Sequence, residues 1–101
     1  MLKDPVRHLR KELSFLFLTN HAFVLILLSR DNRLRMREIA EEIGITERAV
    51  KRIVDELVVA GYLSMSKSGR RNVYSLNAEQ RLRHPILGNL ALEQLLRLSA
   101  L

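Results

Sequence analysis

"REIAEEIGITERAVKRIV", residues 37–54, is the stretch that decides the fold of this chain. Ala40 lies four residues before Gly44, and the aliphatic Val50 lies six residues after that glycine. A small residue lets two helices cross closely, and a glycine readily adopts the left-handed conformation that ends a helix. The spacing therefore predicts two short helices joined by a tight turn, with Val50 filling the angle between them.

Two apolar stripes at helical spacing support this prediction. They comprise Ile39, Ala40 and Ile43 before the turn, and Val50, Ile53, Val54 and Leu57 after it. Thr46 stands at the N-cap position of the second helix, and Glu47 follows at the positive end of its dipole. We expect a helix-turn-helix unit over residues 36–60, with its second helix over residues 46–60.

The outer face of this second helix is rich in charge. It carries Thr46, Glu47, Arg48, Lys51, Arg52 and Asp55. Residues 36–60 hold four basic and six acidic residues, whereas residues 1–35 and 61–84 each have a net charge of +4. We therefore expect the positive charge of residues 36–60 to be concentrated on one face, with the acidic side chains Glu38, Glu41, Glu42 and Glu56 on faces turned away from it.

A β-hairpin follows the two helices. "YLSMSK" (62–67) and "NVYSLN" (72–77) alternate apolar and polar residues with the period of a strand. Between them Gly69 is available for positive φ, so residues 62–77 predict a hairpin with Arg70 and Arg71 at its tip.

Helices are expected on both sides of these elements. Asp4 and Pro5 predict a helix over residues 5–18, and the apolar "FVLILL" predicts a central helix from His21 to about Arg30. Pro85 opens a further helix that we expect over residues 85–100. The chain is thus predicted to be one α+β domain over residues 1–101, mostly helical, with a two-stranded hairpin.

The two terminal helices have more apolar surface than one small domain can bury. In the last helix we expect Leu87, Leu90, Ala91, Leu95 and Leu98 on one face, with Leu92 and Leu96 outside it. Exposed apolar faces usually mark an interface, so we predict a two-fold dimer. Its candidate interface residues are Leu9, Leu13, Phe17, Leu87, Leu90, Leu95 and Leu98.

Composition limits the class of partner. Among 101 residues, 17 Lys+Arg against 11 Asp+Glu give a formal charge of +6, which favours nucleic acid or an anionic membrane surface. The longest apolar stretch, residues 13–28, is interrupted by polar residues and is shorter than the roughly 20 residues of a spanning helix. There is no cysteine, which fits a reducing cytoplasm. We expect a soluble cytoplasmic protein.

No pattern of catalytic or metal-binding residues emerges. His8, His21 and His84 are widely spaced and lack carboxylates at ligand spacing, so no metal site is predicted. Ser64, Ser66 and Ser68 lack the motif of a nucleophile. We therefore expect neither an enzyme nor a cofactor.

Three segments together resemble a known group of proteins. "LTNHAFVLILLSRDNRLRMREIAEEIGITERAVKRIVDELVVAGYL" (18–63), "GRRNVYSLN" (69–77) and "RLRHP" (81–85) follow one another in the order found in small prokaryotic regulators. The chain thus resembles the winged helix-turn-helix transcription regulators of the MarR and ArsR types. It lacks the cysteine ligands of metal-sensing ArsR proteins and the long flanking helices of full MarR proteins, so no effector is inferred.

The resemblance implies a homodimer that binds double-stranded DNA. The recognition helix 46–60 would lie in the major groove, and the hairpin, here called the wing, would grip the backbone or minor groove through residues 68–72. Base contacts are then expected from Arg48, Ala49 and Arg52, because arginine binds guanine bidentately and alanine can meet a thymine methyl. Backbone contacts are expected from Thr46, Lys51, Arg70 and Arg71.

Two other functions remain open on the sequence alone. A winged helix can serve as a protein-interaction module, in which case the basic helix is only a solvated face. It can also bind RNA, using charge for shape and phosphate contacts.

Overall fold

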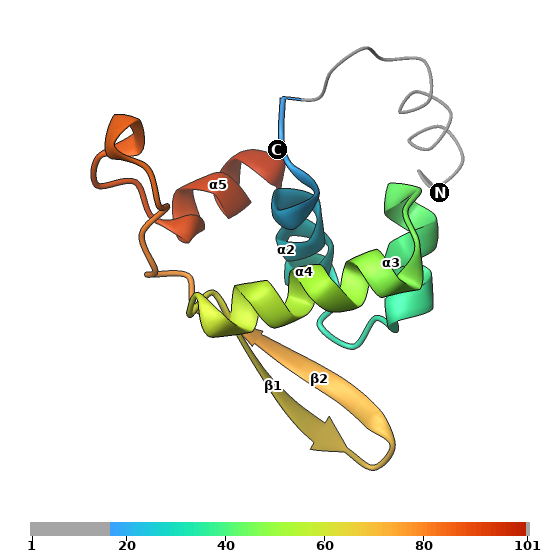
Figure 1. The fold of residues 1–101 in the computed structure, drawn as a ribbon. Coiled ribbons are helices and arrows are strands. Elements are labelled where there is room, and N and C mark those ends of the chain that lie inside the picture. The colour runs from blue at the N-terminus through green and yellow to red at the C-terminus, as the bar shows by residue number, and fades with distance from the viewer. Residues whose placement is uncertain (1–16, 101) are drawn as a thin grey trace.

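The computed structural model of the protein describes residues 17–100. Its elements are α2 (Asn20–Arg30), α3 (Met36–Ile43), α4 (Glu47–Val59), β1 (Leu63–Ser68), β2 (Arg71–Leu76), a 3-10 helix η1 (Pro85–Leu87) and α5 (Leu92–Ser99). In Figure 1, α4 crosses α2, the hairpin projects below α4, and α5 lies at the opposite side from α3. This is the predicted α+β winged helix-turn-helix fold. The helix expected over residues 5–18, with Leu9 and Leu13, lies almost wholly outside the described residues.

Helix α2 is the centre of the core, as its apolar sequence predicts. The Thr19 hydroxyl caps its first turn by accepting from the Ala22 N–H at 3.3 Å. Val24, Leu25, Ile26 and Leu28 are buried, and the helix contacts α3, α4, β2 and α5. Within residues 17–100 no helix is long and apolar enough to cross a membrane.

The helix-turn-helix forms as predicted. All seven residues of the two stripes, Ile39, Ala40, Ile43, Val50, Ile53, Val54 and Leu57, are buried. Gly44 has a φ of 85°, and its N–H donates to the Ala40 carbonyl at 2.8 Å. The left-handed residue thus ends α3 and directs the chain into α4.

The wing is a two-stranded antiparallel hairpin. Ser68 pairs with Arg71, which leaves Gly69 and Arg70 as a two-residue turn. Gly69 has a φ of 65° and Arg70 does not have positive φ, which is the pattern of a type II′ turn. Tyr74 is buried on the inner face of the hairpin, as its alternation predicts.

Strand β2 is also fixed to the turn between α2 and α3. The Tyr74 N–H donates to the Asn32 carbonyl at 3.0 Å, and the Asn32 side-chain amide donates to the Tyr74 carbonyl at 2.9 Å. This pair of bonds holds the base of the wing against the core, so the position of the wing relative to α4 is set by the fold.

The C-terminal segment differs from the continuous helix expected over residues 85–100. After η1 the chain is interrupted at Gly88, which has a φ of 59°, and α5 begins only at Leu92. Backbone bonds made elsewhere fix this interruption, because the Leu82 N–H donates to the Leu90 carbonyl and the Leu92 N–H donates to the Gln80 carbonyl, each at 2.9 Å.

One side of α5 packs against the core of its own chain. Leu92 is fully buried, and Leu95 and Leu96 pack against the core, whereas Leu98 is 68% exposed. From the sequence, Leu92 and Leu96 were expected outside the apolar face assigned to an interface, and in the structure they lie with Leu95 against the core. The Leu92 N–H donates to the Gln80 carbonyl, which starts α5 at Leu92 and places this residue against the core.

Candidate nucleic-acid interface

The outer face of α4 brings together five of the six residues that the sequence predicted for it, Glu47 being the exception. One open hollow of about 590 Å³ is lined by Thr46, Arg48, Ala49, Lys51, Arg52, Asp55 and Glu56. These positions recur three and four residues apart along the helix, on the side opposite the buried stripe. Glu56 was expected to lie away from this face, and that prediction is wrong.

The cations of this face differ in whether they form ion pairs. Lys51 Nζ lies 2.7 Å from Asp55 Oδ2, and Arg52 Nη1 lies 3.6 Å from Glu56 Oε2. Arg48, one turn nearer the start of the helix, is exposed and has no hydrogen bond or ion pair with any other described residue. Arg48 at the start of α4 therefore has no acidic partner among the described residues, while Asp55 and Glu56 offset Lys51 and Arg52 one turn further along.

Glu56 connects α4 to α2 as well. Its Oε1 lies 2.7 Å from His21 Nε2, while its Oε2 faces Arg52. All three side chains are substantially exposed, so each contact contributes little to stability. These contacts were not predicted from the sequence, although Glu56 follows Arg52 by four residues and so must share its face.

Glu56→Gln is expected to raise the affinity for duplex DNA of any sequence by about 0.2 to 1 kcal/mol at low salt. The change removes a negative charge from the outer face of α4 and releases Arg52 from its ion pair. Fluorescence anisotropy against labelled duplexes measures the effect. Glu93→Gln, which breaks the ion pair with Arg97 on α5, is the matched control. If Glu56→Gln weakened DNA binding and Glu93→Gln did not, Glu56 would instead position Arg52 for its DNA contact.

Thr46 has a structural role at the start of α4. Its hydroxyl accepts from the Ala49 N–H at 3.0 Å, which satisfies a backbone donor of the first turn. The same side chain lines the outer hollow, so the Thr46 hydroxyl would serve both as the helix cap and as the expected phosphate contact.

We expect Thr46→Ala to lower the free energy of unfolding by about 1 kcal/mol, because the cap is lost. Thr46→Ser keeps the hydroxyl and should change stability little. Urea denaturation of the three proteins checks both statements. Equal stability of Thr46→Ala and the unchanged protein would mean that the cap bond contributes nothing.

The wing tip places its two arginines differently. Arg70 is exposed at the turn, whereas Arg71 is half-buried and its Nε donates to the Arg33 carbonyl at 3.2 Å. Arg71 therefore reaches back from the wing to the turn between α2 and α3. Arg33 and Arg35, which were not predicted from the sequence, lie beside the two wing arginines. Their alternation with the half-buried Leu34 and Met36 could have predicted that both arginines are exposed on one side of the chain.

The histidines of the described part of the chain have structural partners. His84 Nδ1 accepts from the Ile86 N–H at 3.1 Å at the start of η1, and His21 pairs with Glu56. Within residues 17–100, no three His, Cys, Asp or Glu side chains gather in a way that could hold a metal ion.

Comparison with known proteins points to the same part of the chain. The family model described as winged helix-turn-helix DNA-binding matches residues 24–64, which run from α2 to the start of β1. No curated protein matches the chain. Residues 24–64 are therefore similar to winged helix-turn-helix DNA-binding domains in sequence as well as in fold, and this similarity supports double-stranded DNA as a partner.

Proposed function

We propose that the protein is a sequence-specific transcription regulator that places α4 in the major groove of duplex DNA. The observation that carries the proposal is the division of α4 into two sides. Val50, Ile53, Val54 and Leu57 are buried on one side, while Arg48, Lys51 and Arg52 stand exposed on the other. A helix anchored in this way can present its cations to base edges without losing its packing.

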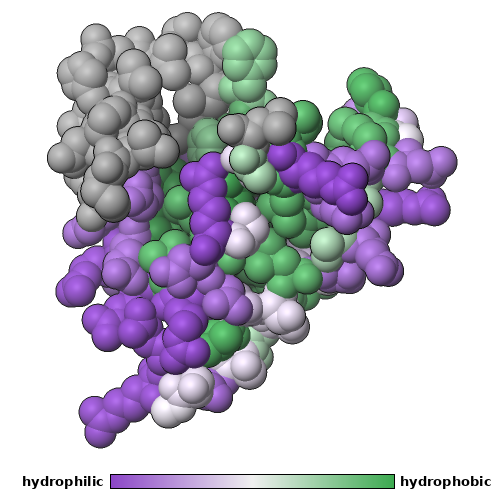
Figure 2. Space-filling model, turned by 180° about the vertical axis from the view of Figure 1, so that it is seen from behind, coloured by the Kyte–Doolittle hydropathy of each residue, from purple (hydrophilic) through white to green (hydrophobic). Residues whose placement is uncertain are grey.

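The roles of the side chains follow from their chemistry and surroundings. Arg48 and Arg52 contact guanine, and the half-buried Ala49 between them allows close approach to a thymine methyl. Lys51 and Thr46 contact phosphates beside the groove. Arg70 and Arg71 contact the backbone or the minor groove, since the wing extends beside α4 with hydrophilic side chains over its surface (Figures 1 and 2).

We further propose a homodimer of the MarR and ArsR kind. Apolar side chains stand exposed in the C-terminal segment, with Ile86 86% and Leu98 68% exposed and Leu87 and Leu90 more than one third exposed. Figure 2 shows hydrophobic surface gathered there, at the upper right of that view. Phe17 is 93% exposed and belongs to the same proposal, whereas Leu95 packs against the core of its own chain. A two-fold dimer would place two recognition helices about 34 Å apart, on successive major grooves.

Competition between nucleic acids tests the proposal. A labelled DNA duplex bound to the protein is titrated with unlabelled duplex DNA and with duplex RNA of the same sequence, while sedimentation measures the mass of the complex. Displacement by DNA at much lower concentration than by RNA, with two chains per duplex, supports the proposal. Equal displacement by RNA contradicts it, because A-form RNA has a major groove too narrow for a helix.

A further inference from the structure

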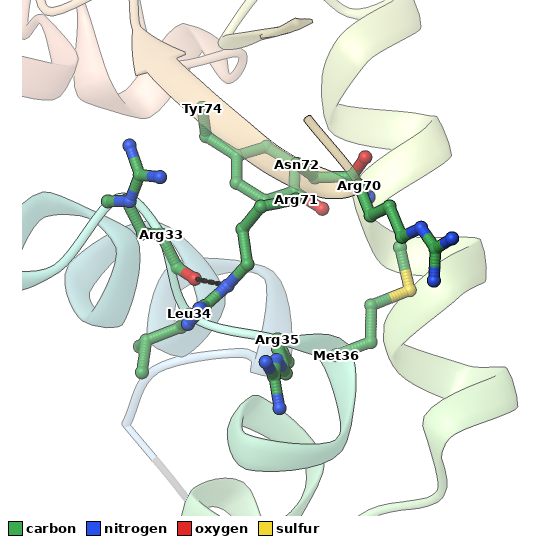
Figure 3. A pocket seen from close by; sticks show the side chains of 8 residues that line it. All are labelled: Arg33, Leu34, Arg35, Met36, Arg70, Arg71, Asn72 and Tyr74. Carbon is green, nitrogen blue, oxygen red and sulfur yellow. Dashed lines mark hydrogen bonds between the residues drawn. The ribbon is translucent and has the colours of Figure 1, made fainter. Parts of the chain in front are cut away.

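A second group of arginines lies between the wing and the turn that joins α2 to α3. They surround a hollow of about 450 Å³ lined by Arg33, Leu34, Arg35, Met36, Arg70, Arg71, Asn72 and Tyr74. Four of these eight residues are arginines and none is acidic. Figure 3 shows that the side chains come from both elements, with Arg71 reaching from the wing to the turn and the guanidinium ends of Arg33, Arg35 and Arg70 pointing in different directions around it.

The fold fixes the backbone on both sides of this hollow. On the turn, Asp31 Oδ1 accepts from the Arg33 N–H at 3.0 Å, and Glu38 Oε1 accepts from the Arg35 N–H at 2.7 Å. Leu34 and Met36 pack against the core, which leaves the alternating Arg33 and Arg35 exposed. On the wing, the two bonds between Tyr74 and Asn32 hold β2 in place.

Arg71 crosses the hollow from the wing to the turn. Its Nε donates to the Arg33 carbonyl at 3.2 Å, the bond drawn as a dashed line in Figure 3. This bond uses one nitrogen of the guanidinium, and among residues 17–100 its two terminal nitrogens make no hydrogen bond. Arg71 is thus oriented by the protein and still has donors for a ligand.

No acidic side chain lines the hollow, so the positive charge of its arginines is not neutralised by a lining residue. The nearest acidic residues in sequence, Asp31 and Glu38, each accept a bond from a backbone N–H. Four arginines line the hollow without a carboxylate among them, and an anion with several oxygens lowers the repulsion between like charges of this kind. The planar fork of arginine matches the oxygens of phosphate, to which it donates two parallel bonds.

We propose that this hollow, formed by Arg33, Arg35, Arg70 and Arg71, binds a phosphate group. The group can be a phosphodiester of duplex DNA or a free phosphorylated molecule, which present the same chemistry. The case in which the phosphate belongs to DNA rests on the proposed function, because Arg70 and Arg71 belong to the wing that is proposed to contact the DNA backbone. Arg33 and Arg35 then extend the contact surface from the wing to the start of α3.

DNA titration at several salt concentrations is the first arm of the test. Arg33→Ala and Arg35→Ala are each expected to weaken binding to all duplexes by about 3- to 10-fold and to lower the logarithmic salt slope by about 1. Arg97→Ala is the matched control, since Arg97 is exposed on α5 and pairs only with Glu93 among the described residues. It should leave affinity and slope nearly unchanged. Thermal melts verify that each variant is folded.

Titration of the DNA-free protein with inorganic pyrophosphate, followed by NMR, is the second arm. Saturable shifts at the turn and wing that disappear in Arg33→Ala and Arg35→Ala support the site, even if DNA affinity is unchanged, and then assign it to a free ligand. Unchanged DNA affinity together with no saturable pyrophosphate binding overturns it. If the unchanged protein binds no duplex, the proposed function fails, while the pyrophosphate arm still decides whether the phosphate site exists.

Discussion

Arg48→Ala is expected to weaken binding to the specific DNA site by about 1 to 3 kcal/mol and to relax the preference at one base pair. Arg48 is exposed in the first turn of α4 and has no hydrogen-bond or ion-pair partner among residues 17–100, so no described side chain competes with a base for its guanidinium. Arg52→Ala should cost less, because Arg52 gives up its ion pair with Glu56 when it binds DNA. Titration of the specific duplex and a scrambled duplex measures both effects.

Lys51→Ala and Arg71→Ala are the comparison variants for this prediction. Both side chains are assigned to phosphates, so their loss should lower binding to the specific and the scrambled duplex alike. If Arg48→Ala also lowered both equally, Arg48 would be a phosphate contact and its assignment as a base reader would be wrong.

Ile53→Ala is expected to lower the free energy of unfolding by about 2 to 5 kcal/mol. Ile53 is 2% exposed and lies in the core that α4 shares with α2 and α3. Deletion of three buried carbons removes apolar contacts and leaves a cavity that the surrounding helices fill only in part. For a domain of this size the loss is a large share of the total stability, and DNA binding should disappear at the temperature where the variant unfolds. Denaturation in urea measures it.

Val59→Ala on the same helix is the matched control. Val59 is 88% exposed, so its truncation should change stability by less than about 0.5 kcal/mol. Equal losses for the two variants would contradict the placement of the buried and exposed faces of α4.

The sequence predicted α3, the turn and α4 because their signals are local. Ala40, Gly44 and Thr46 each act within a few residues of their own position, through close packing, a left-handed backbone and a cap. The hairpin was predictable for the same reason, since its alternation and Gly69 specify two strands and a tight turn. These signals also placed Arg48, Lys51 and Arg52 on one face.

The C-terminal segment could not be predicted in the same way. Pro85 signals a helix start, but Gly88 and backbone bonds between distant residues, such as Leu82 with Leu90, end that helix after one 3-10 turn. The meeting of Arg33 and Arg35 with the wing likewise depends on Tyr74 and its bonds to the α2–α3 turn. Tertiary pairing of this kind leaves no mark in local periodicity. The position of Glu56, in contrast, could have been predicted, because it follows Arg52 by four residues and helix geometry places the two side by side.

Selection of random duplex DNA by the purified protein, with titration of the enriched site at several salt concentrations, tests the central claim most directly. We predict enrichment of an inverted repeat whose half-sites lie about one helical turn apart, with strong preference over scrambled DNA and a steep salt slope. Absence of any enriched sequence, or equal salt-sensitive binding to every duplex, would contradict a dimeric, sequence-specific DNA-binding protein.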